Sequence, residues 1–162
     1  MMFKEIHIYD LDGTVIDSTH RYQTKTNSKG ETKIDLEYWL NNLHRAGEDT
    51  LLPLAEQFKK HIADPTILVI VATARQMHKA DWSFIDKHFG RLKIDGFVSR
   101  KLGDVSTKGA DMKIAGIQNV IRAMDAEGVK TRFFYEDNVE YLNRVSAAIG
   151  AKPVFIESKQ GY

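Results

Sequence analysis

The sequence predicts a three-layer α/β/α fold, in which helices cover both faces of a mostly parallel β-sheet. Short apolar runs alternate along the chain with amphipathic helical patterns. That alternation is typical of parallel sheets whose strands are joined by crossover helices. At 162 residues the chain fits one domain. We therefore expect a single domain over residues 1–162, with a small lid segment at 19–50.

Strands are expected where apolar runs are short and rich in β-branched residues. The run Thr66–Ala72 (TILVIVA) has the composition of a strand that is buried on both faces. The other strand candidates are Ile6–Tyr9, Arg132–Tyr135, Pro153–Ile156 and the weaker Gly96–Val98.

Helices are expected where apolar residues recur at three- and four-residue spacing. Gly150 follows the last of these segments as a helix stop. The polar, aperiodic segment Thr19–Lys33 is expected to be a loop or a small excursion. The predicted helices are Asp35–Ala46, Leu54–Ile62, Trp82–Phe89, Asp111–Ala126 and Asn138–Ile149.

Composition excludes several classes of protein. A net charge of +1 gives no strong overall field toward nucleic acid or acidic partners. The chain has no cysteine, which excludes disulfides and cysteine-ligated zinc. No apolar run approaches the length of a membrane helix, and the N-terminus has no secretory pattern. A cytoplasmic protein is the expectation.

Acidic residues follow two of the predicted strands. Asp10 and Asp12 come after the first strand, and Glu136 and Asp137 follow a distant one. Ligands of such sheets bind beyond the carboxyl ends of the strands, so these carboxylates are expected to meet. Carboxylates this close need a cation or a shared proton, and Mg²⁺ prefers oxygen ligands. The sequence thus predicts a Mg²⁺ site; the alternative is a surface turn with a helix N-cap.

A hydroxyl and several cations follow other strands. Thr73 can donate a hydrogen bond to a phosphoryl oxygen, and Arg75 can bind phosphate or orient a carboxylate. The alternative for this pair is a helix N-cap beside a solvated arginine. Lys113, near the start of a predicted helix, points back toward the strand ends, where it can offset negative charge. Lys108, in the preceding loop, is a competing candidate.

Together these segments resemble the four motifs of the haloacid dehalogenase superfamily of aspartyl phosphohydrolases. Asp10–Thr14 (DLDGT) is similar to the first motif, Thr73 to the second, Lys113 to the third and the pair Glu136–Asp137 to the acidic fourth. The motifs stand in the family's order over nearly the whole chain. The resemblance implies a Rossmann-like fold with a minimal cap domain or none, and a phosphatase activity.

The resemblance also implies roles for these residues. Asp10 attacks phosphorus and forms an aspartyl-phosphate. Asp12 protonates the leaving oxygen and then deprotonates the attacking water. Thr73 and Lys113 hold the phosphoryl group. Mg²⁺ is expected among the Asp10 carboxylate, the Asp12 backbone carbonyl and the acidic pair, Glu136 and Asp137. The fourth motif often has aspartate at the position of Glu136, so which of the pair touches the metal directly is open.

A second resemblance concerns the substrate. Arg100–Asp104 (RKLGD), the positions Lys108, Asp111 and Lys113, and the tail Gly161–Tyr162 are similar to the phosphatase domain of phage-type polynucleotide kinase-phosphatases. That family removes 3′-phosphates from nucleic acid ends. Its kinase half is absent, since no GxxxxGK[ST] loop occurs. Phosphodiester binding needs cations along the cleft; the alternative is ordinary surface charge. The expected cations are Arg75, Arg100, Lys101, Lys108 and Lys113.

The expected function is thus a polynucleotide 3′-phosphatase, with two alternatives. One is a small-molecule phosphatase such as a nucleotidase, with Thr19–Lys33 as a lid. The other is an inactive protein that binds phosphate or a partner. Because little chain separates the motifs, we expect an open site, which suits a phosphate at the end of a bulky molecule. Tyr22, Tyr38 and Trp39 can stack on a base, although the spacing of Trp39 favours core packing. The residues expected to bind substrate are Gly13, Thr14, Ala74, Arg75, Arg100 and Lys108.

Overall fold

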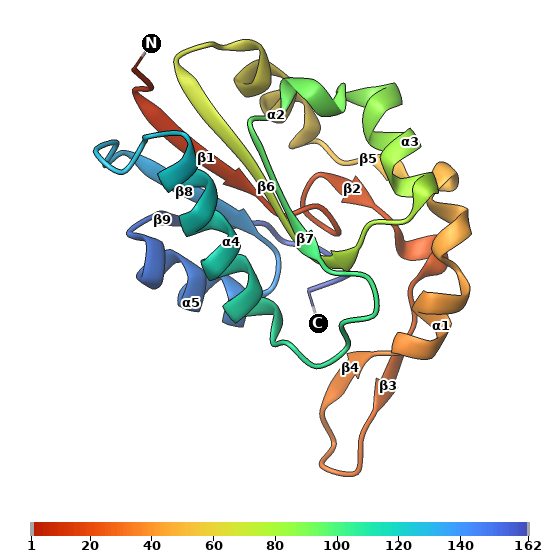
Figure 1. Ribbon diagram of the computed structural model, residues 1–162. Coiled ribbons are helices and arrows are strands. Elements are labelled where there is room, and N and C mark those ends of the chain that lie inside the picture. The colour runs from red at the N-terminus through yellow and green to blue at the C-terminus, as the bar shows by residue number, and fades with distance from the viewer. Residues whose placement is uncertain (1, 162) are drawn as a thin grey trace.

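The computed structural model describes residues 2–161 and confirms the predicted three-layer fold (Figure 1). One sheet has the strand order β7-β6-β1-β8-β9, and every neighbouring pair is parallel. All five expected strands are present, with ends shifted by a few residues. Their bounds are β1 Glu5–Tyr9, β6 Ile67–Gln76, β7 Gly96–Arg100, β8 Arg132–Glu136 and β9 Lys152–Phe155.

Helices cover both faces of this sheet (Figure 1). On one face, α4 (Gly109–Ala123) lies over β6 and β7, and α5 (Val139–Ile149) over β8 and β9. On the other face lie α2 (Ala55–Ala63), α3 (Lys79–His88) and the short 3-10 helix η3 (Arg91–Lys93). Among residues 2–161, no helix has the length and apolar character that crossing a membrane requires.

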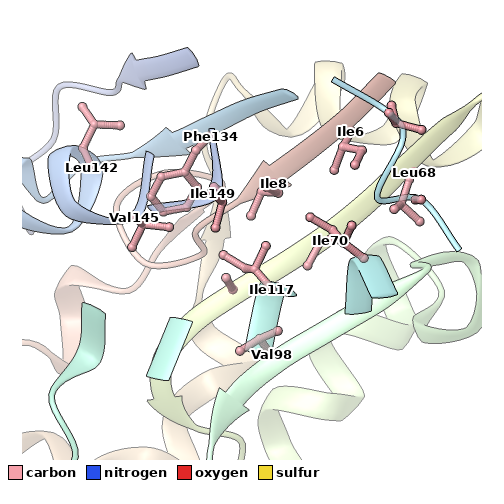
Figure 2. Packing of buried hydrophobic residues seen from close by; sticks show 14 of the residues in the cluster. Ile6, Ile8, Leu68, Ile70, Val98, Ile117, Phe134, Leu142, Val145 and Ile149 are labelled. Carbon is pink, nitrogen blue, oxygen red and sulfur yellow. The ribbon is translucent and has the colours of Figure 1, made fainter. Parts of the chain in front are cut away.

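The strands alternate their side chains between two hydrophobic cores, because successive residues of a strand point to opposite faces. Ile8 and Ile70 pack beneath α4 and α5, against Ile117 and other buried residues of those helices (Figure 2). The next residues of the same strands, Tyr9 and Val71, belong to the second core, under α2 and α3. Burying one such side chain stabilises the fold by about 1.5–3 kcal/mol. These cores hold the carboxyl ends of β1, β6 and β8 side by side.

The predicted helix Asp35–Ala46 is interrupted in the structure. It divides into α1 (Leu36–Asn41) and the 3-10 helix η2 (Leu43–Glu48). Asn42 stands at the break, where its side-chain amide donates to the Tyr38 carbonyl at 2.7 Å. Asparagine side chains compete in this way with the helical backbone hydrogen bonds. The prediction of one continuous helix was therefore wrong.

The segment Thr19–Lys33 forms a small excursion, which was one of the two expectations for it, and this excursion has regular structure. It contains the 3-10 helix η1 (Thr19–Arg21) and an antiparallel hairpin of β3 (Thr24–Thr26) and β4 (Thr32–Ile34). The side chains of β3 are all exposed, so the hairpin has no alternating apolar pattern to reveal it. Two further strands, β2 (Ile16–Asp17) and β5 (Thr50–Leu51), pair at the base of this segment.

Candidate active site

The chain reverses tightly after β1, and this reversal carries Asp10 and Asp12. The Leu11 carbonyl accepts hydrogen bonds from the backbone N–H groups of residues 14–16, at 2.9–3.0 Å. Gly13 has a φ of 78°, which favours glycine. A Cβ at Gly13 would also lie 2.1 Å from the Asp137 Oδ2 atom. The reversal thus requires glycine both for backbone conformation and for space.

Three carboxylates from two strand ends meet beside this reversal. Asp10 follows β1, Glu136 ends β8 and Asp137 comes next; all three side chains are buried. One potential ligand atom from each lies within 4.8 Å of the others. Lys113, from the first turns of α4, donates to Asp10 Oδ1 at 2.9 Å and to Glu136 Oε1 at 2.6 Å. The expected convergence of the acids with Lys113 is therefore present.

The cluster has three carboxylates and one lysine, and the pKa values of its aspartates are raised. Burial, and then the neighbouring Glu136 charge, raises the pKa of Asp10 to about 8. Burial likewise raises the pKa of Asp137 to about 7, with a further contribution from Asp10. Burial opposes the charge on Lys113, but Asp10 and Glu136 outweigh it and raise the Lys113 pKa. A cluster of this kind suits an additional cation with a preference for oxygen ligands.

The Asp12 carboxylate lies outside this acidic cluster and has other partners. Its Oδ1 atom accepts a hydrogen bond from the Ser18 hydroxyl at 2.8 Å. Its Oδ2 atom forms an ion pair with Arg75 Nε at 3.2 Å. Asp12 also lines the same cavity as Asp10. The side chain of Asp12 is thus held by Ser18 and Arg75 and is not part of the acidic cluster.

Thr73 lies in an irregular part of β6, where the register with β7 shifts between Ala72 and Gln76. The Thr73 hydroxyl accepts from the Arg75 backbone N–H at 3.3 Å, and Thr73 lines the cavity. The next helix, α3, begins later and has His78 as its N-cap. Thr73 and Arg75 therefore do not form the helix N-cap that was the alternative to a functional role.

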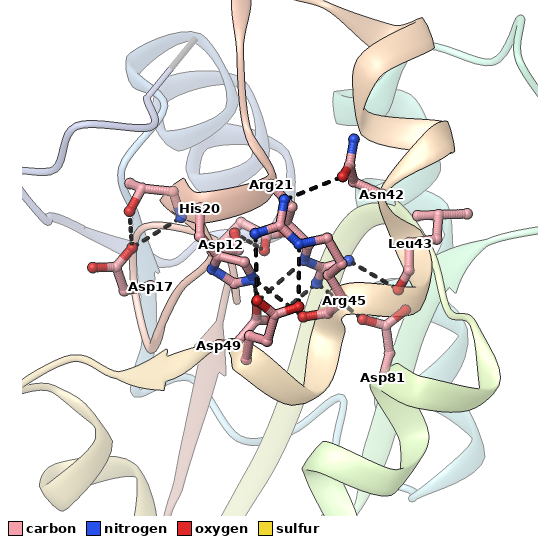
Figure 3. A network of polar contacts seen from close by, with 12 residues as sticks. Asp12, Asp17, His20, Arg21, Asn42, Leu43, Arg45, Asp49 and Asp81 are labelled. Atoms are coloured by element: carbon pink, nitrogen blue, oxygen red, sulfur yellow. Dashed lines mark hydrogen bonds and ion pairs between the residues drawn. The ribbon is translucent and has the colours of Figure 1, made fainter.

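Arg75 belongs to a buried ionic network that joins the segment 19–50 to the rest of the domain. Its guanidinium forms ion pairs with Asp12 and with Asp81 of α3. Arg21 donates to Asp81 at 3.0 Å and, with two nitrogens, to Asp49 at 3.1 and 2.9 Å (Figure 3). The Arg21 side chain is fully buried, and its guanidinium lies 4.5 Å from the centre of the Trp39 ring.

One cavity of about 240 Å³ contains the residues of this site. The acidic cluster, Asp12, Thr73 and Lys113 line its floor. The segment 19–50 supplies an apolar wall, so the site is less open than we expected. Trp39 both packs as a buried residue and lines this cavity. The wall consists of Tyr22, Ile34, Leu36, Trp39, Leu40 and Leu43.

Of the residues expected to bind substrate, Ala74, Arg75 and Arg100 line this cavity. The guanidinium of Arg100 donates to the Ala74 and Thr107 carbonyl oxygens at 2.7 and 2.5 Å, and it forms an ion pair with Asp104 at 3.7 Å. Lys108 is not among the lining residues, because it lies exposed at the N-cap of α4.

Gly13 and Thr14 also lie elsewhere than we expected. Both face a second cavity, of about 490 Å³, on the other side of the Asp10–Asp12 reversal. The buried Thr14 hydroxyl donates to Asp10 Oδ2 at 3.1 Å. These two residues shape the reversal and hold the Asp10 carboxylate instead of lining the main cavity.

Sequence reasoning missed two groups of residues at this site. The first is the ionic network of Arg21, Asp49 and Asp81, whose members are isolated polar residues in the sequence. The second is Ser18 with Gln160, which contact each other although 142 positions separate them. Nothing in the local sequence marks either group. The tail Gly161–Tyr162 was part of the resemblance to polynucleotide kinase-phosphatases. Gly161 contacts Asn138, and Tyr162 lies outside the described residues.

Solved structures with the same arrangement identify the class of fold. A haloacid dehalogenase-like hydrolase from Streptococcus pneumoniae is 11% identical, covers 97% of this chain and 88% of its own, and has a TM-score of 0.63. CbbY from Rhodobacter sphaeroides, solved in complex with phosphate, is 15% identical and has a TM-score of 0.58. The match covers 96% of this chain and 88% of CbbY. The chain has the haloacid dehalogenase-like fold.

The family is narrower than the fold. The family model described as bacteriophage T5 5′-deoxynucleotidase matches residues 1–147, and the chain belongs to this family. The 5′-deoxynucleotidase of Escherichia phage T5 is 36% identical over 85 residues, which are 51% of this chain and 34% of that protein. The chain thus spans about a third of this curated relative. These findings support the expected superfamily but not the relationship to polynucleotide kinase-phosphatases.

We predict that Arg21→Met strongly destabilises the protein. The substitution removes a cation that pairs with the buried carboxylates of Asp49 and Asp81. Breaking a buried ion pair in this way costs about 3–5 kcal/mol of folding stability. The free energy of unfolding of the wild-type protein and of each variant would be measured by urea denaturation. Arg45→Met is the matched control, because Arg45 lies in the same segment but forms an exposed ion pair with Glu48. Equal losses in the two variants would show that the buried network has no special role.

Proposed function

We propose that this protein is a Mg²⁺-dependent phosphatase that hydrolyses 5′-deoxynucleotides through an aspartyl-phosphate on Asp10. The observation that carries the proposal is the joint position of Asp10, Asp12, Thr73 and Lys113 on the floor of one cavity. Membership of the 5′-deoxynucleotidase family supports the choice of substrate.

The proposed reaction has two steps. A carboxylate oxygen of Asp10 bonds to phosphorus while the bond from phosphorus to the 5′ oxygen breaks, and Asp12 gives that oxygen a proton. Water then attacks the phosphorus of the aspartyl-phosphate and loses a proton to Asp12. Inorganic phosphate leaves, and both carboxyl groups return to their starting state. Thr73 and Lys113 supply a hydroxyl and a positive charge for the phosphoryl oxygens.

Asp10, Asp137 and the Asp12 carbonyl would hold Mg²⁺, with Glu136 next to it. Both Glu136 oxygens already have partners: Oε1 accepts from Lys113, and Oε2 accepts from the backbone N–H groups of residues 137 and 138, at 3.0 and 3.2 Å. This supports Asp137 as the direct ligand of the pair. When bound, Mg²⁺ would keep Asp10 ionised and neutralise charge on the phosphate.

The cations of the cavity suit a single phosphate. Lys113 and Arg75 are paired with carboxylates, and Arg100 is paired with backbone carbonyls. A nucleic acid strand carries a phosphate at each step and is bound through several cations. We therefore favour a small monoester, the nucleotidase alternative, over a polynucleotide 3′ end.

The apolar wall suits the remainder of a nucleotide. Its aromatic and aliphatic side chains can pack against a base and a deoxyribose ring. The wall comes from the segment 19–50, which we propose acts as a small built-in cap of the single domain.

A substrate panel tests this proposal. We expect the kcat/KM for 5′-deoxynucleotides to exceed that for small sugar phosphates by at least about 10-fold, because losing apolar contacts to the base costs roughly 10–200-fold. Phosphate release would be measured with Mg²⁺ for 5′- and 3′-deoxynucleotides, sugar phosphates and 3′-phosphorylated oligonucleotides. A clear preference for the oligonucleotides would instead favour a polynucleotide 3′-phosphatase.

Two substitutions test the roles of the aspartates. We expect Asp10→Asn to abolish turnover with an unchanged circular dichroism spectrum. Asp12→Ala should lower kcat by about 10²–10⁴-fold, which is the usual contribution of general acid–base catalysis. Asp17→Asn is a nearby control, since Asp17 lies in β2 and faces the second cavity. Near-normal turnover in the Asp10 variant would rule out this residue as the nucleophile.

Metal binding has its own prediction. Adding Mg²⁺ to the metal-free protein should raise Tm, because the ion binds the folded state. At a Mg²⁺ concentration of about 100 times the Kd, the free energy of unfolding should increase by about 2.7 kcal/mol. Asp137→Asn should remove most of this rise, because it deletes a buried ligand. Glu140→Gln, an exposed change in the next helix, should leave the rise intact. An undiminished rise in the Asp137 variant would place the metal elsewhere.

A further inference from the structure

The segment 157–161 follows β9, the edge strand of the sheet, and runs back to the active-site cavity. Gln160 is 6% exposed and lines both the main cavity and the second cavity behind the Asp10–Asp12 reversal. The match to the 5′-deoxynucleotidase family ends at residue 147, so this segment lies beyond the part that the family model describes. Its contacts lead to two carboxylates of the site.

The first set of contacts runs from Gln160 through Ser18 to Asp12. The Gln160 side-chain amide donates to the Ser18 hydroxyl at 2.8 Å, and its oxygen accepts from the Ser18 backbone N–H at 3.1 Å. The Ser18 hydroxyl in turn donates to Asp12 Oδ1 at 2.8 Å. Because a hydroxyl has one proton, the donation from Gln160 directs the Ser18 proton toward Asp12.

This hydrogen bond is well placed to set the orientation of Asp12. The other partner of the carboxylate, Arg75 Nε, lies at ion-pair distance but without hydrogen-bond geometry. Ion pairs constrain direction less than hydrogen bonds do. Ser18 is fully buried, so water does not replace its contact with Asp12. The orientation of the Asp12 carboxylate therefore depends on Ser18, and that of Ser18 depends on Gln160.

The second set of contacts runs from Ser158 to Asp137. The Ser158 hydroxyl donates to Asp137 Oδ2 at 2.6 Å and accepts from the Gln160 backbone N–H at 2.8 Å. The segment also passes very close to Asp137, because a Cβ on Gly161 would lie 2.5 Å from the Asp137 carbonyl oxygen. Asn138 donates to the Gly161 carbonyl at 3.4 Å. The same short segment thus contacts the Asp137 carboxylate directly and reaches the Asp12 carboxylate through Ser18.

We propose that residues 157–161 complete the active site, with Gln160 positioning Asp12 through Ser18 and Ser158 positioning Asp137. Neither residue touches the reacting atoms, so both are positioning residues. The role of Gln160 rests on the proposed function, because it acts on the general acid of that reaction. The role of Ser158 concerns the acidic cluster and can be measured without turnover.

Gln160→Met tests the first role, since methionine has a similar length and cannot donate a hydrogen bond. We expect kcat for a 5′-deoxynucleotide to fall by about 10–100-fold, the scale of a misplaced catalytic group, with KM changed by less than about 3-fold. The first-turnover burst with 4-nitrophenyl phosphate should change little, because its leaving group departs without a proton. A loss that is equal for both substrates, or no loss, overturns the role of Gln160.

Two further variants keep this test decisive. Ser18→Ala interrupts the same contacts at the next residue, and it should reproduce the loss even if Gln160→Met folds poorly. The double variant should lose no more than either single one, because residues of one network are not additive. Additive losses would mean that the two residues act separately. Glu157→Gln is the matched control, since Glu157 is exposed in the same segment.

Ser158→Ala tests the second role through the Mg²⁺-dependent rise in Tm. We expect the Mg²⁺ concentration for half of the rise to increase by about 10–100-fold, as for other residues that orient metal ligands. An unchanged concentration overturns the role of Ser158. If the wild-type protein does not hydrolyse 5′-deoxynucleotides, the proposed function fails, and this melting experiment still decides whether the segment orients the acidic cluster.

Discussion

The structure of the site depends on a buried charge imbalance. The buried side chains of Asp10, Glu136 and Asp137 converge at the cavity, and Lys113 is the cation in contact with two of them. Burying carboxylates is costly unless they are paired. Lys113 joins three parts of the fold, because it comes from α4 and contacts residues at the ends of β1 and β8. The sheet, the packing of α4 and the site therefore constrain one another.

The fold and the centre of the site were predictable from the sequence because both follow from position relative to strands. Buried parallel strands are recognisable as short apolar runs, and the residue after each run lies at the ligand-binding edge. This reasoning located Asp10, Asp12, Thr73, the Glu136–Asp137 pair and Lys113. It worked because the backbone position of each of these residues is set by its own strand or helix, although distant residues contact some of their side chains.

The remainder was not predictable because it depends on tertiary contacts. Arg21 and Asp81 form an ion pair across 60 positions, and Gln160 reaches Ser18 across 142. The hairpin of β3 and β4 is exposed and polar, so hydrophobic periodicity does not mark it. The expected basic cleft was also incomplete. A side chain's charge is visible in the sequence, but whether that charge is already neutralised, as for Arg75, is visible only in the structure.

The polynucleotide interpretation arose from the same limitation. Positively charged residues near a phosphate site suggested a strand of nucleic acid, but Lys108 lies away from the cavity and Arg100 holds backbone carbonyls. Apolar side chains of the segment 19–50 also line the cavity and form the wall described above. The wall was invisible beforehand because its members come from a helix that breaks at Asn42 and from a hairpin that had no recognisable pattern.

The anchoring of Arg21 has a consequence for the shape of the cavity. Moving the wall outward would separate the fully buried Arg21 from the Asp81 carboxylate of α3. The recess beside the acidic cluster is therefore held in shape by buried charge as well as by apolar packing.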